Sequence, residues 1–485
     1  MIMVGMLFFS ISPFFAQQTV TLGDAIRIAQ SNSFDAQLAR FSFLSSYWAY
    51  KSYKAELLPS MNLSGGLMNF NHSRVEARNA EDGKINYVDN NSLVNSLTLS
   101  LQQPVSSLGG TLSLQSYFYR LDQFDYKMTT YNTLPLRLSY SQPFTSYNEW
   151  KWRKKTEPKE YEKAKRVYQE SIEDIAIKVS NLYFAAISAL SDYQQSLAKS
   201  QDLEELYRIS QRRLELGTIT KGDLLQLELS KLNAKVTVNE AKVKLNDSLY
   251  DLFSYMRVTD YEHANLLPPE NVLDMVLNVN DVLLKARTNS SHAITQDLEL
   301  IAAQQNLSKA KSAQGIQMHL NAEVGFNRTA DGFAAAYSHL QDNEIIGVTV
   351  TVPIFDWGVK KGRVMVAKSN LELAKTKKEQ ADNDYVQSVK REVMQFSLQA
   401  AQCRTSLQAQ RISQERYDIT KKRFEAGNVS VTELNTALQE LETAKSQYIS
   451  QLRTYWNYYY TLRKFTLYDW VQHQELTVDF DALVL

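Results

Sequence analysis

The sequence contains the same helix-turn-helix pattern twice, and this duplication constrains the fold more than any other feature. Residues 213–235 read RLELGTITKGDLLQLELSKLNAK, and residues 423–445 read RFEAGNVSVTELNTALQELETAK. In each copy a glycine, Gly217 or Gly427, separates two long helical patterns. Glycine commonly ends a helix because it reaches the left-handed conformation at little cost. Each copy is therefore expected to form the tip of a helical hairpin.

A capping pair follows each glycine. Thr220 and Ser430 precede the returning helix, and the acids Asp223 and Glu433 stand three residues later. A hydroxyl at the start of a helix accepts an N–H bond of the first turn, and an acid at this spacing can complete a capping box. The sequence predicts outgoing helices at about 150–215 and 357–425 and returning helices at about 220–257 and 430–466.

The duplication extends over nearly the whole chain. Residues 21–57 predict a helix, and residues 278–314 match it without gaps at an offset of 257 residues. In the second outgoing helix, apolar side chains recur at steps of three and four residues, which is typical of a heptad seam. The seam consists of Val386, Val389, Val393, Phe396, Ala400, Cys403 and Leu407.

Between these helices the apolar period changes to two, which predicts amphipathic strands. The strands are expected within about 60–144 in the first copy and 317–353 in the second. The hairpin tips match at an offset of 210 residues, and the difference between 257 and 210 gives the first copy about 47 additional residues. We assign them to an extra strand pair near 108–122 and 132–142 and to a longer loop at 72–92. Each chain would then contribute four or six strands to a sheet.

Composition excludes several classes of function. The chain has 53 basic and 53 acidic residues and no basic stripe, which excludes a strongly basic protein that binds nucleic acid. A single cysteine excludes an intramolecular disulfide and a cysteine-based metal site. The six histidines have no metal-ligand spacing, and no phosphate-binding or nucleophile motif occurs. We therefore expect no enzymatic activity, no cofactor and no metal.

The first residues form a short apolar run that ends at Ala16, and residues 1–16 are interpreted as a signal peptide. No Lys or Arg precedes the run, so the true N-terminus stays open. No later window has the ~18 consecutive apolar residues of a membrane helix. A membrane location would therefore require a β-barrel.

Four to six strands cannot close a barrel within one chain, and an open sheet would leave unpaired edges. Closure would require several chains, whose long hairpins would continue the barrel as a helical cylinder. Such a tube, with one end in a membrane and the other at the hairpin tips, would be a conduit. The alternative is a secreted or surface coiled-coil protein, structural or adhesive, with a small β-head.

The sequence resembles the TolC-like outer-membrane efflux proteins over residues 19–468. The resemblance rests on the order, spacing and duplication of TVTLGDAIRIAQSNS, LLPSMNLSGG, QPF, VPIFDWG and the two turns RLELGTITKGDLLQLE and RFEAGNVSVTELNTAL. It implies an α+β membrane protein: a homotrimer whose transmembrane β-barrel continues as a long periplasmic coiled-coil α-barrel. It also implies the outer membrane of a Gram-negative bacterium, with contact to outer-membrane lipid.

The resemblance implies a function as well. The chain would be the channel or exit duct of a tripartite efflux or type I secretion system, passing substrates from an inner-membrane pump through a periplasmic adaptor to the exterior. The pump could be of RND, ABC or MFS type, and neither the pump class nor the substrate follows from the sequence. The parts in order would be a signal peptide (1–16), a first repeat (17–258), a linker (259–277), a second repeat (278–468) and a C-terminal tail (469–485).

In this family the hairpin tips form the closed entrance and the site where the adaptor docks. The resemblance assigns these roles to Gly217, Thr220, Asp223, Leu224, Gly427, Ser430, Glu433 and Leu434.

The lock that holds the entrance of the best-known member closed is incomplete here. An aspartate at the position of Asp223 bonds there to a tyrosine and an arginine near the second turn. Phe424 and Val429 occupy those two positions and supply neither a hydroxyl nor a charge. A different set of residues would have to hold the entrance. Arg213 and Arg423 are the candidates to pair with Asp223 or Glu433.

Overall fold

The structure, a computed structural model, describes residues 19–78, 83, 85–145, 147–259, 265–269, 272 and 275–484. The predicted signal peptide and part of the predicted linker lie outside the described residues. No described helix combines the length and the apolar character needed to cross a membrane. The described residues form a helical unit, from parts of 1–44, 164–293 and 382–485, and a sheet unit, from parts of 45–163 and 294–381.

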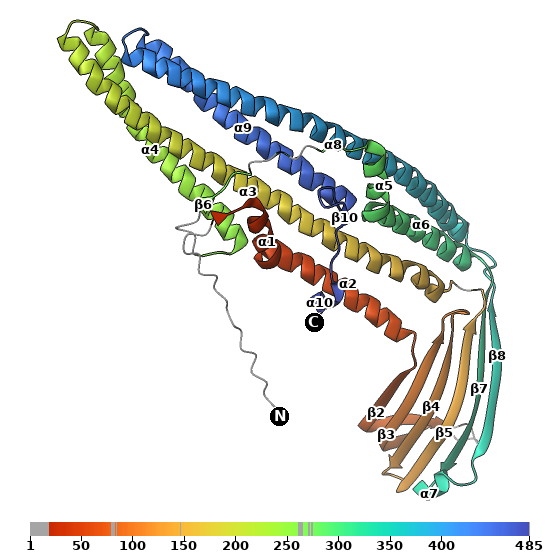
Figure 1. Cartoon of the computed structure of the whole chain (residues 1–485). Coiled ribbons are helices and arrows are strands. Elements are labelled where there is room, and N and C mark those ends of the chain that lie inside the picture. Colours follow the sequence, from red (N-terminus) through yellow and green to blue (C-terminus); the bar gives the residue numbers. More distant parts are fainter. Residues whose placement is uncertain are drawn as a thin grey trace. The chain divides into compact units, whose positions relative to one another are not determined.

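Four long helices display the duplication (Figure 1). α3 (Glu149–Glu215) and α8 (Val359–Glu425) have 67 residues each, and the returning helices α4 (Lys221–Met256) and α9 (Val431–Thr466) have 36 each. Five positions of the predicted seam on α8 are buried in the core of the helical unit: Val389, Val393, Phe396, Ala400 and Cys403.

The helices predicted at 21–57 and 278–314 are each interrupted, so the prediction of continuous helices is wrong. The first is α1 (Leu22–Asn32) and α2 (Phe34–Glu56), and the second is α5 (Val279–Asn289) and α6 (His292–Gln314). Ser33 and Ser290 have extended backbones at the breaks. The Ser33 hydroxyl accepts the N–H of Ala36 at 3.2 Å. Serine competes for backbone bonds in this way and so favours a new cap over a continued helix.

Short elements complete the helical unit. β1 (Thr19–Val20) pairs with β6 (Asn265–Leu266) in parallel, and β9 (Tyr468–Asp469) pairs with β10 (Gln474–Glu475) antiparallel, before α10 (Phe480–Val484). The buried Tyr183 hydroxyl lies 2.8 Å from the carbonyl oxygen of Val20 and 2.7 Å from that of Leu267. It thereby fixes the β1–β6 pair to α3.

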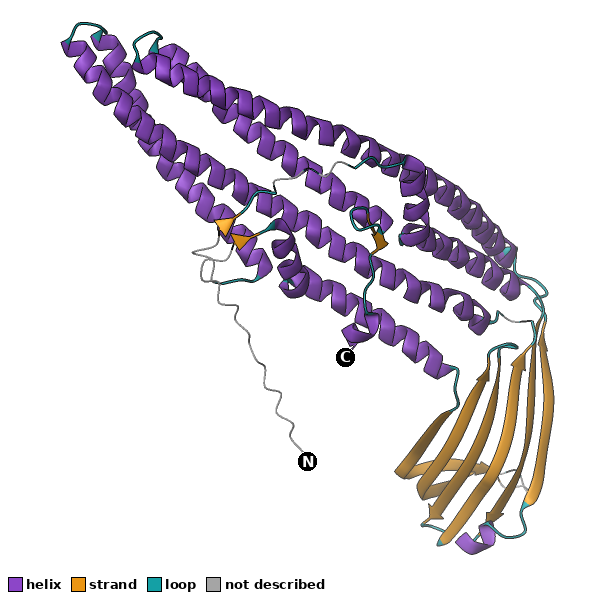
Figure 2. Cartoon of the chain, viewed as in Figure 1, coloured by secondary structure: helices purple, strands orange, loops and turns teal. Residues whose placement is uncertain are grey.

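Six strands form one antiparallel sheet in the order β2-β3-β4-β5-β7-β8 (Figure 2). They are β2 (Ser60–Arg78), β3 (Ile85–Val105), β4 (Gly110–Gln123), β5 (Met128–Pro143), β7 (Gln317–Ala330) and β8 (Gln341–Thr351), with α7 (Phe333–Ala336) between the last two. The loop predicted at 72–92 is wrong, because most of it belongs to the β2–β3 hairpin. The partners Arg74 and Asp89 form an ion pair of 2.9 Å there, so charged pairs hold the register where apolar alternation fades.

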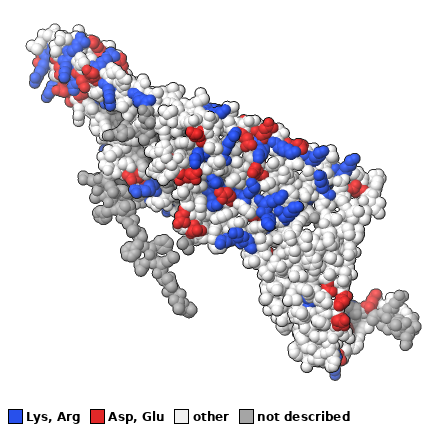
Figure 3. Space-filling view, turned by 45° about the vertical axis from the view of Figure 1, so that its right-hand side comes forward, with Lys and Arg blue, Asp and Glu red and all other residues white. Residues whose placement is uncertain are grey.

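One face of this sheet is apolar and exposed. Leu114, Leu138 and Val324 are cross-strand partners in one row, and Leu138 and Val324 are 42% and 46% exposed. The opposite face is polar and includes an ion pair between Arg137 and Glu323 at 3.3 Å. Figure 3 shows the surface over the strands largely free of charged side chains. The alternation therefore gives the sheet one face suited to water and one suited to an apolar surrounding.

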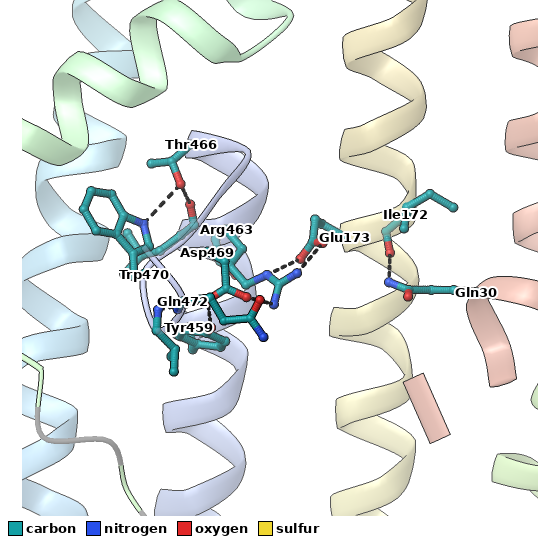
Figure 4. A network of polar contacts seen from close by, with 12 residues as sticks. Gln30, Ile172, Glu173, Tyr459, Arg463, Thr466, Asp469, Trp470 and Gln472 are labelled. Atoms are coloured by element: carbon teal, nitrogen blue, oxygen red, sulfur yellow. Dashed lines mark hydrogen bonds and ion pairs between the residues drawn. The ribbon is translucent and has the colours of Figure 1, made fainter. Parts of the chain in front are cut away.

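A buried ion-pair network ties α9 to α3 and to the C-terminal segment (Figure 4). Arg463 Nη2 donates to Oε1 of Glu173 at 3.1 Å, and its Nη1 donates to Oδ2 of Asp469 at 3.0 Å. Asp469 also accepts the backbone N–H groups of Val471 and Gln472. Glu173 is only 3% exposed. A charge this deep is costly unless it is paired, so each group depends on its partners.

Replacing Arg463 by methionine should therefore lower the free energy of unfolding by about 3–5 kcal/mol, because it leaves buried carboxylates without a cation. Urea unfolding followed by helical circular dichroism measures this. The matched control is Lys464→Met, which removes an exposed ion pair to Asp174 and should cost less than about 1 kcal/mol. Equal losses for the two variants would contradict a structural role for the network.

Candidate channel entrance at the hairpin tips

The two glycine turns end their helices in the same way. Gly217 has φ +72° and Gly427 has φ +83°, both in the left-handed region. The N–H of the residue after each glycine donates back to the carbonyl of Arg213 or Arg423, at 2.9 Å in both copies. This bond closes the last helical turn and satisfies a carbonyl that the helix leaves free.

The returning helices begin with the predicted caps. The Thr220 hydroxyl accepts the N–H of Asp223 at 3.2 Å, and the Asp223 carboxylate accepts the N–H and the hydroxyl of Thr220. These bonds hold the pKa of Asp223 below its ordinary value of 3.8. The ionised carboxylate therefore contributes its full stabilisation of the cap at pH values above 3.8. This stabilisation is lost only as the pH falls through the lowered pKa. Ser430 accepts the N–H of Glu433 at 3.2 Å in the second copy.

The two tip arginines make different contacts. Arg423 Nη1 lies 3.7 Å from Oε1 of Glu433, within the second hairpin. Arg213 instead reaches from the first hairpin to the second, where its Nη2 donates to the carbonyl oxygens of Phe424 at 3.1 Å and Glu425 at 3.0 Å. These carbonyls belong to the last turn of α8, where a cation is favoured by the helix dipole. Asp223 is bonded to Thr220 and not to either arginine.

A small apolar core joins the two hairpins, and we call it the tip cluster. Phe424 is 3% exposed within it, and the Arg213 guanidinium lies over its ring with 5.5 Å to the ring centre. Val429 packs against its margin. The two residues that depart from the family pattern thus belong to an apolar contact. The buried members of the tip cluster are Leu203, Leu206, Leu227, Ala234, Tyr417, Phe424, Leu434, Ala437 and Leu441.

Polar contacts beside the tip cluster also cross between the hairpins. Asp202 on α3 accepts hydrogen bonds from the Tyr417 hydroxyl at 2.5 Å and from Lys421 at 2.6 Å, both on α8. The hydrogen bond to Asp202 raises the pKa of Lys421. Nothing in the sequence pointed to Asp202, because an ion pair between helices about 200 residues apart has no local signature. For the α3 side of the tip cluster, the one signal in the sequence was the spacing of three residues between Leu203 and Leu206, which places both on one face of a helix.

The predicted tip residues lie together, but they differ in exposure. Asp223 and Leu224 are half-buried, Leu434 is buried, and the other five are exposed. No group of His, Cys, Asp and Glu in the described part of the chain is arranged to hold a metal ion. The arrangement is a joint between two hairpins, held by Arg213, by the contacts of Asp202, by an ion pair of 3.1 Å between Lys199 and Glu442, and by the tip cluster. These contacts hold the two hairpins together.

Comparison with known proteins identifies the architecture. Residues 285–466 match the family model described as outer membrane efflux protein. A search of curated protein sequences finds no match. Among solved structures, the CmeC outer membrane channel of Campylobacter jejuni has 16% identity and a TM-score of 0.66, with 95% of this chain and 88% of that chain covered.

Two further channels have the same fold. The outer membrane protein VceC of Vibrio cholerae has 13% identity and a TM-score of 0.64, with 94% of this chain and 97% of that chain covered. The MtrE outer membrane channel of Neisseria gonorrhoeae, solved in its open state, has 14% identity and a TM-score of 0.61, with 94% and 91% covered.

The structural matches confirm the predicted α+β fold. Residues 285–466 are thus similar to outer membrane efflux proteins, and the chain as a whole has the fold of the outer membrane channels.

Proposed function

We propose that the chain is the exit duct of a tripartite efflux or type I secretion system and acts as a homotrimer. An inner-membrane pump supplies the energy, and a periplasmic adaptor connects the pump to the hairpin tips. The observation that carries the proposal is that a single chain leaves two kinds of surface without partners: the edges and apolar face of its sheet, and apolar stripes on its long helices.

The sheet has two free edges, β2 and β8. Unpaired backbone groups at such edges are not tolerated in a bilayer, where a spanning sheet must close. Three copies of the six-strand sheet would supply 18 strands. Barrels of 16–18 strands are wide enough to enclose an aqueous channel. The exposed apolar row of Leu138 and Val324 would then face lipid, and the polar face with Arg137 would line the channel.

The helical unit has matching free surfaces. An α4 stripe consists of Leu225, Leu229, Leu232, Val236, Val243 and Tyr250, which recur at steps of 3, 4 and 7 and are 54–60% exposed. It lies opposite the buried side of α4, which includes Leu227 and Ala234. On α8, Met394, Leu398, Ile412 and Ile419 form an α8 stripe that is also exposed. Exposed heptad stripes are what a neighbouring helix covers in a coiled coil. We pair the α4 stripe of one copy with the α8 stripe of the next.

A charge placed on the α4 stripe should therefore prevent trimer assembly. Leu232→Glu should shift detergent-solubilised protein from trimer to monomer in analytical ultracentrifugation and abolish conductance in planar bilayers, because the interface would bury an unpaired carboxylate. The control is Asn233→Glu, which places the same charge on the neighbouring exposed position. A stable elongated monomer of the unaltered chain would instead favour the coiled-coil adhesin.

Entrance control is assigned to the joint between the hairpins. Arg213 and the tip cluster hold the first hairpin against the second, and opening requires those contacts to part. The bonds from Arg213 to two α8 carbonyls take the place of the lock that Phe424 and Val429 cannot form. An adaptor opens the entrance only if it binds the separated arrangement more tightly than the closed one.

Arg213→Ala should raise single-channel conductance severalfold while the trimer stays intact, because it removes the bonds between hairpins without touching the α4 stripe. Asp223→Ala is the informative comparison, since the hydrogen bonds that the structure describes for the Asp223 side chain stay within its own cap. Arg212→Ala, an exposed neighbour, should leave conductance unchanged. If Arg213→Ala conducts like the unaltered channel, the joint does not hold the entrance.

The tips present an exposed docking surface to the adaptor. Leu216 is 77% exposed, and Thr218 and Asn428 are exposed beside the two glycines. The one native cysteine, Cys403, is buried, so an introduced cysteine will be the only reactive one.

A photo-activatable cross-linker on Asn428→Cys should capture a periplasmic adaptor in intact cells, identified by mass spectrometry. The same probe on Thr237→Cys, exposed on α4 beyond the tip, should capture far less. Equal capture from both positions, or capture of unrelated proteins only, would contradict docking at the tips.

A further inference from the structure

The helix ends that adjoin the sheet carry a strong excess of positive charge. Within 51–57, 149–155, 309–316 and 356–363 there are eleven basic and three acidic residues, a net charge of +8 in a chain whose net charge is zero. All four segments belong to the sheet unit. We call their cations the basic collar: Lys51, Lys54, Lys151, Arg153, Lys154, Lys155, Lys309, Lys311, Lys360, Lys361 and Arg363.

The helix dipole explains only part of the basic collar. Lys54 and Lys311 lie in the last turns of α2 and α6, where cations are favoured. The cations at 151–155 and 360–363 lie at the starts of α3 and α8, where the dipole disfavours them. Each start has one acid: Glu149 lies in the first turn of α3, and the Asp356 carboxylate accepts the N–H groups of Gly358 and Lys360 at the start of α8, both at 3.0 Å. Seven cations in 149–155 and 356–363 outnumber these two acids, so the excess of positive charge needs a cause other than the helix dipole.

Ion pairs within the chain do not supply that cause. Arg153 is engaged by Glu56 at 2.5 Å and by Glu157 at 3.2 Å. In the part of the chain that the structure describes, no carboxylate lies within ion-pair distance of Lys151, Lys154, Lys360, Lys361 or Arg363. Lys151, Lys154, Lys361 and Arg363 are also exposed. These side chains are thus available to an external anion.

Exposed aromatic and aliphatic groups accompany the cations. In the segment that leads into α8, Ile354, Phe355 and Trp357 are 93%, 71% and 88% exposed. At the start of α3, Lys155 lies over the Trp152 ring with 5.1 Å to its centre. Tryptophan and lysine at one level are typical of the boundary between hydrocarbon and headgroups in a bilayer. Both helix starts follow directly from strands whose apolar face is exposed.

We propose that the basic collar binds the headgroups of anionic phospholipids at the bilayer surface where the strands end. The proposal rests on the proposed function, because it requires the sheet to span the membrane. Several flexible ammonium groups without protein partners match a layer of phosphodiester anions better than a single bound ligand. Trp357 and Phe355 enter the headgroup boundary beside them. The attraction is electrostatic, so it weakens as salt concentration rises.

The test uses the intact trimer, reconstituted into nanodiscs of phosphatidylcholine alone or with phosphatidylglycerol. Lipids retained after extraction are counted by native mass spectrometry. The unaltered channel should retain phosphatidylglycerol over phosphatidylcholine by at least about fivefold, the effect of one engaged lysine at a bilayer surface. The preference should fall with added salt but should persist in inorganic phosphate at matched ionic strength. Competition by inorganic phosphate would mean that the collar binds free anions, which overturns the proposal.

The collar variant combines Lys151→Gln, Lys154→Gln, Lys360→Gln and Lys361→Gln. Its phosphatidylglycerol retention should fall to the phosphatidylcholine level. The control variant combines Lys221→Gln, Lys242→Gln, Lys390→Gln and Lys422→Gln, four exposed lysines of the helical unit, and should keep the preference. Equal loss in both variants, or no preference in the unaltered channel, would overturn the proposal.

Two further measurements separate other roles of the collar. If the collar variant shifts the reversal potential of the channel but keeps its lipid preference, the cations line the conduit instead. If it loses binding to purified peptidoglycan sacculi but keeps the lipid preference, the cell wall is the partner. A channel that forms trimers and conducts without any lipid preference would refute the collar alone, whereas failure to form trimers would refute the proposed function.

Discussion

The unpaired backbone groups along the outer sides of β2 and β8 need hydrogen-bond partners, and the rest of the structure follows from this need. The six strands pair in one antiparallel order, and that order leaves these two strands at opposite edges. Within a bilayer such edges must find partners, and another copy of the same chain offers both. Because β5 and β8 continue into α3 and α8 after short connections, the symmetry of the proposed trimer would act on the helices as well as on the sheet. The exposed α4 stripe, opposite the buried side of its helix, is the consequence in the helical unit.

The duplication produced two hairpins of equal length whose tips have become different. Phe424 is buried where the first copy has Leu214, and Leu434 is buried where the first copy has the half-buried Leu224. The second tip supplies the apolar core and the carbonyl acceptors, and the first supplies Arg213. A repeat that was symmetric in sequence therefore forms a joint with distinct partners.

Local chemistry determined which features could be predicted. The glycine turns and their caps depend on a few adjacent residues, and the long helices on a persistent apolar period, so all of these were readable from sequence. The break at Ser33 was not, because serine also occurs inside helices and only the bond to Ala36 reveals a new cap. The strands beyond residue 72 were hidden because charged cross-strand pairs replaced apolar alternation. Arg213 was recognised as a gate candidate, but its true acceptors are backbone carbonyls, which no sequence pattern marks.

The charged residues at the starts of α4 and α9 differ from those at the starts of α3 and α8. α4 and α9 begin at the tips with Asp223 and Glu433, as the helix dipole favours, so these acids need no partner to account for them. α3 and α8 begin beside the sheet with lysines and arginines, against the same dipole. Glu149 and the capping Asp356 stand at these starts too, but the cations outnumber them. An excess of cations that neither the helix dipole nor ion pairs within the chain explain is what the proposed layer of anionic headgroups would balance.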